Sequence, residues 1–229
     1  MTDHGVLELV DVSLHHWQTR QFGLGPITFK LGPGECVLLT VAQAESCSLI
    51  GDLAVGLLEP DNGYVRFLDR PWSALDGKAL SAHRGRIGRL FAGHAWLSNL
   101  DVDENILLAA RHHFADSLRS LRRHADALAE QLGLGETPHR RPTQLARHDL
   151  KLAQWIRALL GPKTLLVLEN PLLDVYPAAI PVLFDKLAEA RRQGTALLWL
   201  SSELTEYERR QVDPDWQYAV PEAAAEEWS

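Results

Sequence analysis

The sequence predicts an α/β protein in which a parallel sheet carries a helical insertion. Three short apolar runs, at 36–41, 164–168 and 196–200, are typical of fully buried strands. Helical segments separate these runs, so the strands are expected to pair in parallel through crossovers. The stretch 102–132 is rich in Ala, Leu and Arg and is expected to form the helical insertion together with the segment after it.

The N-terminal third has the alternating apolar and polar pattern of strands. The runs 6–12 and 27–31 both follow this pattern, and a Gly-Pro-Gly turn ends the second. A helix is expected over 46–58, closed by the turn residues 59–63, and a further strand over 64–68. We therefore expect an antiparallel β part near the N-terminus, beside the parallel sheet.

The middle of the chain has helical periodicity. Apolar residues recur three and four positions apart on one face, at Leu118, Leu121, Ala125, Leu128 and Leu132. A Gly-Leu-Gly sequence ends this helix, and a second helix is expected over 145–160. In the last third a helix is expected over 178–193, closed by Gly194, and the tail 221–229 is expected to be frayed.

Composition excludes several classes of function. The chain has 229 residues, 46% hydrophobic and 23% charged, with a net charge of −7. An acidic protein of this kind is not built to bind nucleic acid over its whole surface. The sequence has no apolar run of the roughly 18 to 20 residues that a spanning helix needs. We expect no signal peptide, so a cytoplasmic protein that reaches a membrane only through a partner is predicted.

Neither the cysteines nor the histidines form a metal-binding pattern. Cys36 and Cys47 belong to no CxxC pair, and two thiols without a disulfide framework indicate a reducing compartment. His112 and His113 have no ligand spacing with an acidic residue. No metal site is therefore expected. The basic run 119–123 is interpreted as a solvated helix face.

The loop 41–48 lies where phosphate would bind in a sheet of this type. Ligands of open parallel sheets bind beyond the carboxyl ends of the strands. Phosphate-binding loops there supply backbone N–H groups at a helix N-terminus, with a Lys for the outer phosphates and a Ser or Thr for magnesium. The loop 41–48 has this position, but it contains no glycine and no lysine. Its sequence is Val41-Ala42-Gln43-Ala44-Glu45-Ser46-Cys47-Ser48.

The framework around this loop resembles the ATPase subunits of ABC transporters. The sequence Gly34-Glu35 before the strand is similar to that family's PGE, and 56–63 to its GLLxPxxG. The resemblance extends over nearly the whole chain and implies a P-loop NTPase core. One ABC-type domain is then expected, with a core lobe of 1–91 and 162–229 and a helical subdomain of 92–161.

By this resemblance, the loop has lost its working residues. Val41 and Ala44 stand at glycine positions of the family, Ser46 at the last glycine and Cys47 at the lysine. Ser48 keeps the magnesium-binding serine. Loss of glycine restricts the backbone conformations open to the loop. Glu45 adds negative charge beside the phosphates, a repulsion of a few kcal/mol at moderate dielectric.

The other motifs of the family are replaced as well. Ala92 stands at the glutamine of the Q-loop, and Glu169 and Asn170 stand at the magnesium-organising Asp and the catalytic Glu. Asn has no carboxylate to act as a general base. Tyr176 replaces the D-loop aspartate, and Ser202 the switch histidine. The LSGGQ signature reads Leu145, Ala146, Arg147, His148 and Asp149.

A narrower resemblance concerns the segment 86–113. It is similar to the ATPases of MCE-associated lipid transporters of the Mla type, in which a Leu-Phe pair precedes the Gln and a V-x-x-N follows. This similarity implies bacterial lipid transport.

Several residues keep two interpretations. Cys47 is either a reactive thiol at a helix N-terminus or, as we favour, a small residue tolerated after loss of the lysine. Trp17, or His16 in its place, either stacks on adenine or packs at a sheet edge. Arg147 and His148 either hold a phosphate or lie in solvent, the interpretation we favour. Phe91, Trp96, Leu97 and Leu100 either form a docking groove for a membrane subunit, the interpretation we favour, or belong to the ordinary core.

Three functions follow from these observations. The first is a degenerate pseudo-ATPase subunit of an ABC transporter, which needs no cofactor. It would pair with itself or another nucleotide-binding subunit, dock on a membrane permease at the inner face of the membrane, and bind no nucleic acid. The second is a divergent ATPase that uses ATP and Mg²⁺ through Glu169 and Ser48. The third is a free-standing adaptor that binds proteins without a transporter.

Overall fold

A five-stranded parallel sheet forms the centre of the chain in a computed structural model that describes residues 5–15, 23–93 and 95–221. The strand order is β6-β7-β8-β3-β9, and each neighbouring pair is parallel. The strands are β3 (Cys36–Thr40), β6 (Ile87–Leu90), β7 (Leu165–Glu169), β8 (Ala196–Ser201) and β9 (Trp216–Ala219). The predicted buried runs are thus three neighbouring strands, β7, β8 and β3.

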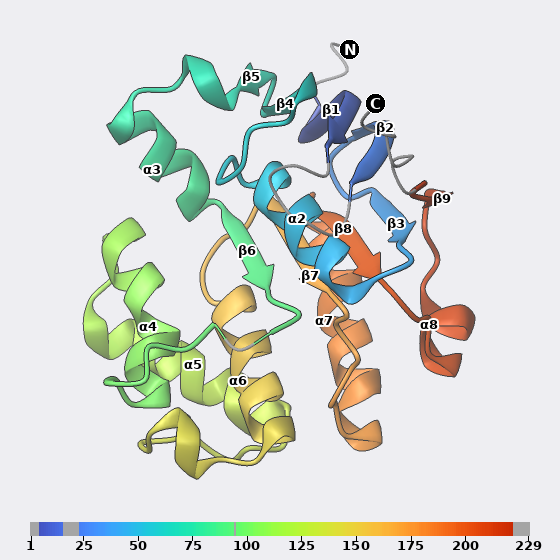
Figure 1. The fold of residues 1–229 in the computed structure, drawn as a ribbon. Coiled ribbons are helices and arrows are strands. Elements are labelled where there is room, and N and C mark those ends of the chain that lie inside the picture. Colours follow the sequence, from blue (N-terminus) through green and yellow to red (C-terminus); the bar gives the residue numbers. More distant parts are fainter. Residues whose placement is uncertain (1–4, 16–22, 94, 222–229) are drawn as a thin grey trace.

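An antiparallel sheet from the N-terminal third lies beside the parallel one (Figure 1). Its order is β2-β1-β4-β5, with β1 (Leu7–Leu14), β2 (Leu24–Leu31), β4 (Asn62–Phe67) and β5 (Arg70–Pro71). Together the two sheets and their helices confirm the predicted α/β fold with an N-terminal antiparallel part.

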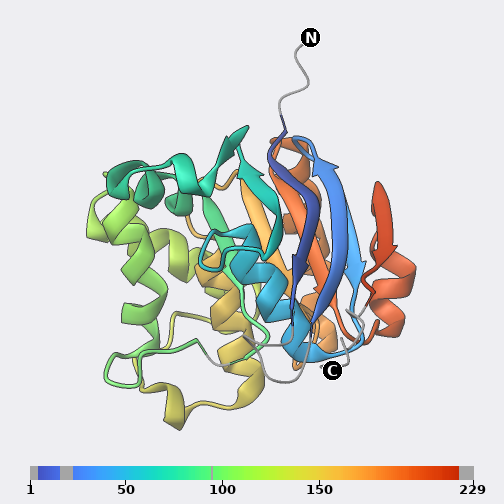
Figure 2. The ribbon, with the colours of Figure 1, turned by 45° about the horizontal axis from the view of Figure 1, so that its top comes forward.

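Helix α2 (Ala44–Ala54) packs between the two sheets, against β7, β8 and β4 (Figures 1 and 2). Helix α7 (Ile180–Arg192) covers the opposite face of the parallel sheet. Side chains alternate between these faces, as a strand requires. In β7, Leu165 and Val167 join the core around α2, whereas Leu166 and Leu168 join the core on the other side.

The helical part lies at the lower left in Figure 1 and packs against β6. It consists of α4 (Val102–His113), α5 (Leu118–Gln131) and α6 (Arg147–Leu159). Trp155 of α6 is fully buried in the core that these helices share with β7 and β8. Short 3-10 turns at 72–74, 142–144 and 177–179 precede or follow other elements. In the described part of the chain, no helix is long and apolar enough to cross a membrane.

The helical stretch 102–132 forms two helices, α4 and α5. The chain leaves α4 at Phe114, whose backbone is extended, and α5 begins after Ser117, whose hydroxyl accepts a hydrogen bond from the N–H of Ser120 at 3.2 Å. The Phe114 ring lies over Gly161, close enough that a Cβ at Gly161 would collide with it. This packing and the Ser cap end one helix and begin the next, although the apolar spacing continues across the break.

Other elements differ in their bounds or were not predicted. The helix expected over 46–58 begins at Ala44 and ends at Ala54, because Gly56 adopts a φ of +67° and turns the chain. Arg84 donates to the Val55 carbonyl at 3.1 Å and also to the Gly56 carbonyl, which closes this helix end. The strands β5, β6 and β9 and the helices α3 (Gly77–Gly85) and α8 (Glu206–Gln211) were not predicted from the sequence.

Candidate functional site

Four of the predicted site segments meet at one edge of the parallel sheet. They follow β3, β6, β7 and β8, and parallel strands bring their carboxyl ends to the same edge. The signature positions are at the start of α6, which packs against β6. This edge is therefore the candidate functional site.

In the loop after β3, the side chains at positions 44–47 are divided between core and solvent. Cys47 is 0% exposed and Ser46 is also buried, whereas Ala44 and Glu45 are exposed. Burial, and then the Glu169 carboxylate, raise the pKa of the Cys47 thiol to about 12. A thiol held protonated by burial is a poor nucleophile.

Glu169, the last residue of β7, is fully buried and accepts three hydrogen bonds. One carboxylate oxygen, Oε2, accepts from the Ser48 hydroxyl at 2.9 Å and from the Ala92 N–H at 2.9 Å. The other, Oε1, accepts from Nε of Arg89 at 2.6 Å. A buried carboxylate needs such partners, because an uncompensated charge in the core costs several kcal/mol. Two of the predicted site positions, Ser48 and Ala92, thus donate to a third, Glu169.

Arg89, on β6, is the cation of this cluster, and the sequence interpretation missed it. Its side chain is 8% exposed, and besides Glu169 it donates to Asp52 of α2 at 2.6 Å and to the Ser48 carbonyl at 3.1 Å. A Cβ at Gly51 would collide with the Arg89 guanidinium and the Glu169 carboxylate. The glycine in α2 therefore makes the room that this ion pair occupies.

Asn170 is bonded to the segment after β8. Its side-chain oxygen accepts from the Ser202 N–H at 2.9 Å and from the Ser202 hydroxyl at 3.2 Å. The residue has a φ of +41°, a conformation that Asn tolerates better than most residues. From the other side, Lys151 of α6 donates its Nζ to the Asn170 carbonyl at 3.0 Å. The two positions that the family uses for base and switch therefore hold each other.

Lys151 is a second buried cation at this edge. Burial lowers the pKa of its ammonium from 10.5 to about 8, although Glu169 acts to raise it. Between these two pH values the unfolded chain binds the proton more tightly than the folded chain, so stability rises with pH in this window.

We expect the Lys151→Met variant to lose this pH dependence. From pH 8 to pH 10.5, the unfolding free energy of the natural chain should rise relative to that of the variant by about 2 to 3 kcal/mol. Urea denaturation of both proteins across the window measures this difference, in which all other titrating groups cancel. The exposed Lys78→Met is the control and should run parallel to the natural chain. Parallel curves for Lys151→Met would contradict the prediction.

The segment 145–149, which resembles the signature, contacts Tyr176 through His148. The ring of His148 lies 3.9 Å from that of Tyr176, centroid to centroid, and its Nε2 is 3.5 Å from Asp149. Arg147 and Ala146 are exposed, and Leu145 is half-buried. Arg147 is thus exposed and His148 is partly covered by Tyr176, and the choice between a phosphate contact and a solvent position stays a prediction.

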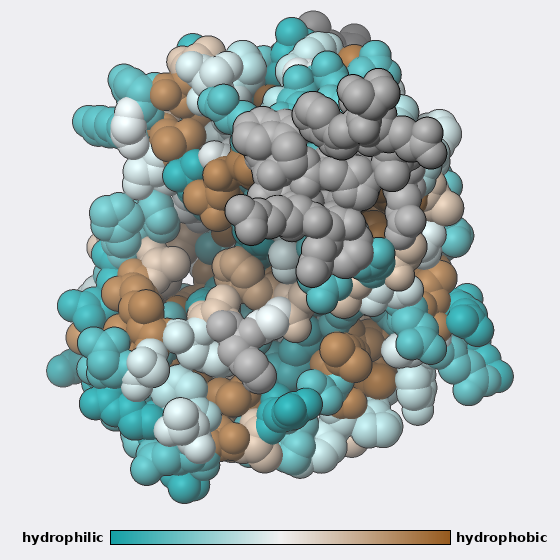
Figure 3. Space-filling view, in the orientation of Figure 1, coloured by the Kyte–Doolittle hydropathy of each residue, from teal (hydrophilic) through white to brown (hydrophobic). Residues whose placement is uncertain are grey.

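The predicted docking residues lie between β6 and α4 and are of two kinds. The rings of Phe91 and Trp96 pack against Arg157 of α6, whose Cζ lies 5.4 Å and 4.7 Å from their centroids. Leu97 is 50% exposed and Leu100 is half-buried. On the face drawn in Figure 3, apolar side chains form separate patches among hydrophilic ones. Phe91 and Trp96 are thus half-buried against α6, Leu97 is exposed, and the docking role of these residues stays a prediction.

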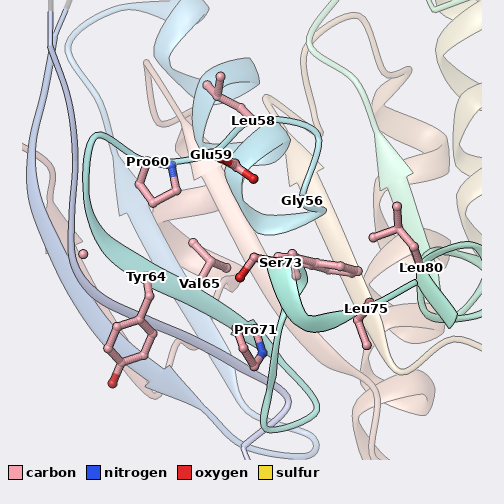
Figure 4. Close-up of a pocket in the computed structure, with 12 residues that line it drawn as sticks. Gly56, Leu58, Glu59, Pro60, Tyr64, Val65, Pro71, Ser73, Leu75 and Leu80 are labelled. Carbon is pink, nitrogen blue, oxygen red and sulfur yellow. The ribbon is translucent and has the colours of Figure 1, made fainter. Parts of the chain in front are cut away.

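A cavity of about 460 Å³ lies at the other end of α2. Figure 4 shows Leu58, Leu75 and Leu80, from three segments, around it. Helix α2 has 11 residues, so its two ends are about 16 Å apart. The cavity is therefore separate from the cluster of Glu169 and from the loop after β3.

The fold is similar to that of solved structures. An ATP-binding subunit of an ABC transporter superposes with a TM-score of 0.78 over 96% of this chain and 90% of its own, at 21% identity. A bacterial ABC transporter cassette solved as a dimer gives a TM-score of 0.75 over 86% and 88%, at 18% identity. These similarities establish the fold. No protein-family model matches the sequence.

Sequence relatives decide the family. The lipoprotein-releasing system ATP-binding protein LolD of Maricaulis maris is 32% identical over 175 residues, 75% of each chain. LolD of Anaeromyxobacter dehalogenans is 31% identical over 173 residues, 73% of this chain and 71% of its own. The chain belongs to the ATP-binding subunits of ABC transporters. The phosphonates import ATP-binding protein PhnC of Treponema denticola is also similar, at 26% identity over 195 residues.

In this ABC ATP-binding subunit, some predicted site positions meet at the strand ends, and others do not. Ser48, Ala92 and Glu169 form one bonded group, and Asn170 with Ser202 forms a second. Trp17 and His16, the candidates for adenine stacking, lie outside the described residues. The two buried cations have a sequence signal, namely a charged residue inside an apolar run: Arg in IGRL and Lys in LKLA.

Proposed function

We propose that this ABC subunit is a pseudo-ATPase, whose role in its transporter is structural or regulatory. It neither binds ATP with magnesium productively nor hydrolyses it. The observation that carries this proposal is the Glu169 cluster, in which the positions that serve magnesium in the family are bonded to one another and to an arginine.

The residues present do not fit magnesium. Mg²⁺ requires oxygen ligands in near-octahedral geometry and is held by carboxylates and hydroxyls. Here both oxygens of Glu169 accept hydrogen bonds, and the Ser48 hydroxyl donates to one of them. A dication bound to Glu169 would lie within a few ångströms of the Arg89 guanidinium, a repulsion of several kcal/mol at moderate dielectric. We therefore derive no catalytic step through a metal ion.

The residues present do not fit the phosphates either. The loop after β3 has no lysine, and its one ionisable side chain that faces solvent is Glu45. The residue at the lysine position, Cys47, is buried. Asn170 cannot take a proton from water, and its side-chain oxygen is bonded to Ser202. These features support the loss of both phosphate binding and hydrolysis.

Calorimetric titration of the purified chain with a non-hydrolysable ATP analogue and Mg²⁺ tests the proposal. We expect no saturable heat up to millimolar nucleotide, because no cation of the loop meets the phosphates. An intact ABC ATP-binding subunit is the positive control. Saturable binding that the Ser48→Ala variant loses would overturn the proposal in favour of the divergent ATPase.

The partners follow from how the family builds its sites. Each ATP site combines the phosphate loop of one subunit with the signature of the other, and this chain has neither half. Paired with itself or an intact subunit, it leaves no complete site. We place it at the inner face of the membrane on a permease, with Leu97 as an exposed apolar contact. A free-standing adaptor would instead be recovered with soluble proteins alone.

For the cargo, we propose a lipid-related molecule. The segment 86–113 is similar to Mla-type lipid transport ATPases, and relatives at 31 to 32% identity belong to lipoprotein-releasing systems. The two similarities differ in the transporter they indicate and agree on a lipid-bearing cargo.

A further inference from the structure

We propose that the Arg89 guanidinium is a resident cation that takes the place of the divalent ion at this edge and fixes α2, β6 and β7 in one arrangement. The inference deepens the proposed function and rests on it, because it explains how the subunit holds its shape without a nucleotide. The result is a subunit whose strand ends do not respond to ATP or to metal ions.

The contacts of Arg89 are those of a cation that joins three elements. The residue itself lies on β6, and its guanidinium reaches Glu169 of β7 at 2.6 Å and Asp52 of α2 at 2.6 Å. A further N–H reaches the Ser48 carbonyl of α2 at 3.1 Å. Planar, always charged and able to donate five hydrogen bonds, Arg is the side chain best suited to such bridging.

The site is complete without any added ligand. Glu169 is 0% exposed and accepts hydrogen bonds from three donors, namely Arg89, Ser48 and the Ala92 N–H. Its charge is neutralised by Arg89, and Asp52, which is partly exposed, is the second anion on the same guanidinium. Gly51 leaves the space for this contact, since any larger residue would collide with both charged groups.

The cluster also extends toward the predicted docking segment. The Cζ of Arg89 lies 4.5 Å from the centroid of Phe91, and Phe91 packs in turn against Arg157 of α6. A cation over an aromatic face is attracted by the ring. Arg89 therefore connects the former metal position to the segment that leads into α4, and fixes both together.

The test uses melting of the purified full chain in the absence of nucleotide. Arg89→Met removes the charge and leaves Glu169 buried without a counterion, so Tm should fall by on the order of 10 °C. The double variant Arg89→Met with Glu169→Gln removes both charges of this buried pair and should recover at least half of that loss. A packing role alone would give no such recovery.

Adding a divalent ion shows whether Arg89 occupies a metal-binding position or is only part of an ordinary buried ion pair. In Arg89→Met, about 10 mM Mn²⁺ should raise Tm by roughly 4 °C, because the freed carboxylate and hydroxyl become oxygen ligands. The natural chain and the double variant should show no shift. The proposal is overturned if Arg89→Met melts like the natural chain, if Mn²⁺ leaves its Tm unchanged, or if Mn²⁺ stabilises the natural chain.

Should Arg89→Met fail to fold, Arg89→Lys keeps the question open to test. The Lys side chain retains the positive charge but lacks the planar guanidinium with its several N–H donors. We therefore expect a folded protein with a Tm a few degrees below that of the natural chain. If Arg89→Lys also failed to fold, the role of the positive charge would be overturned. All these melting measurements omit nucleotide. A result that overturns the role of Arg89 is therefore distinct from a result that overturns the pseudo-ATPase, which would be saturable binding of an ATP analogue.

Discussion

A graft of four residues into the loop after β3 is expected to give the chain saturable affinity for an ATP analogue. The loop already lies between a central strand and the N-terminus of α2, where backbone N–H groups and the helix dipole favour phosphate. What it lacks is glycine flexibility and a cation. The substitutions are Val41→Gly, Ala44→Gly, Ser46→Gly and Cys47→Lys.

The expected gain in affinity is on the order of a hundredfold, since a charged hydrogen bond contributes about 1.5 to 3 kcal/mol and the loop regains more than one. Calorimetry on the natural and grafted chains measures it. Because Arg89 stays in place, the graft should bind the analogue equally well with and without Mg²⁺. Adding Arg89→Met should make the binding depend on Mg²⁺.

The matched control for the graft carries the same three glycines with Cys47→Met. This control regains the loop flexibility without the charge and is expected to remain near the natural chain in affinity. If the full graft and this control bind alike, the lysine is not what the loop has lost. If neither binds, the obstacle lies outside the four substituted positions.

Much of the framework could be predicted because its physical signal is local. The runs that became β3, β7 and β8 are short, apolar and separated by helical segments, a pattern with one common solution in parallel sheets. The position of the site followed from the same pattern, because parallel strands place their carboxyl ends together. The choice of Ser48, Ala92 and Glu169 as site positions needed the resemblance to ABC ATPases as well, and their bonding to one another was not predicted.

The Arg89 and Lys151 contacts could not be predicted, because their partners are far apart in sequence. Arg89 lies 80 residues from Glu169, and Lys151 binds a backbone carbonyl 19 residues away. A charged residue inside an apolar run is ordinarily placed on the solvent side of an element. Only the three-dimensional arrangement shows that both side chains point into the protein and are paired there.

The short elements escaped prediction for a related reason. Strand β9 is exposed along its length and is held by its pairing with β3, so its own sequence has no buried pattern. The break between α4 and α5 depends on Phe114 packing over Gly161, a contact across 47 residues. In each case a tertiary contact outweighs the local periodicity.

The largest loss of stability is expected from Trp155→Ala. The side chain is 0% exposed, lies in the core between the helical part and the parallel sheet, and donates its Nε1–H to the Pro171 carbonyl at 3.1 Å. Removing it leaves a cavity and an unpaired carbonyl directly after the Glu169-Asn170 pair. The unfolding free energy should fall by about 3 to 5 kcal/mol, as for other buried Trp to Ala changes.

Two controls divide this effect into its parts. Trp155→Phe keeps most of the ring volume and loses the hydrogen bond to Pro171, so a smaller loss of about 1 to 2 kcal/mol is expected. Trp216→Ala, at a position 63% exposed, should change the unfolding free energy by no more than about 0.5 kcal/mol. Urea denaturation of the three variants measures the order. Equal losses for Trp155→Ala and Trp216→Ala would mean that α6 is not held to the sheet by this side chain, and the support beneath Asn170 would have to be sought in Lys151.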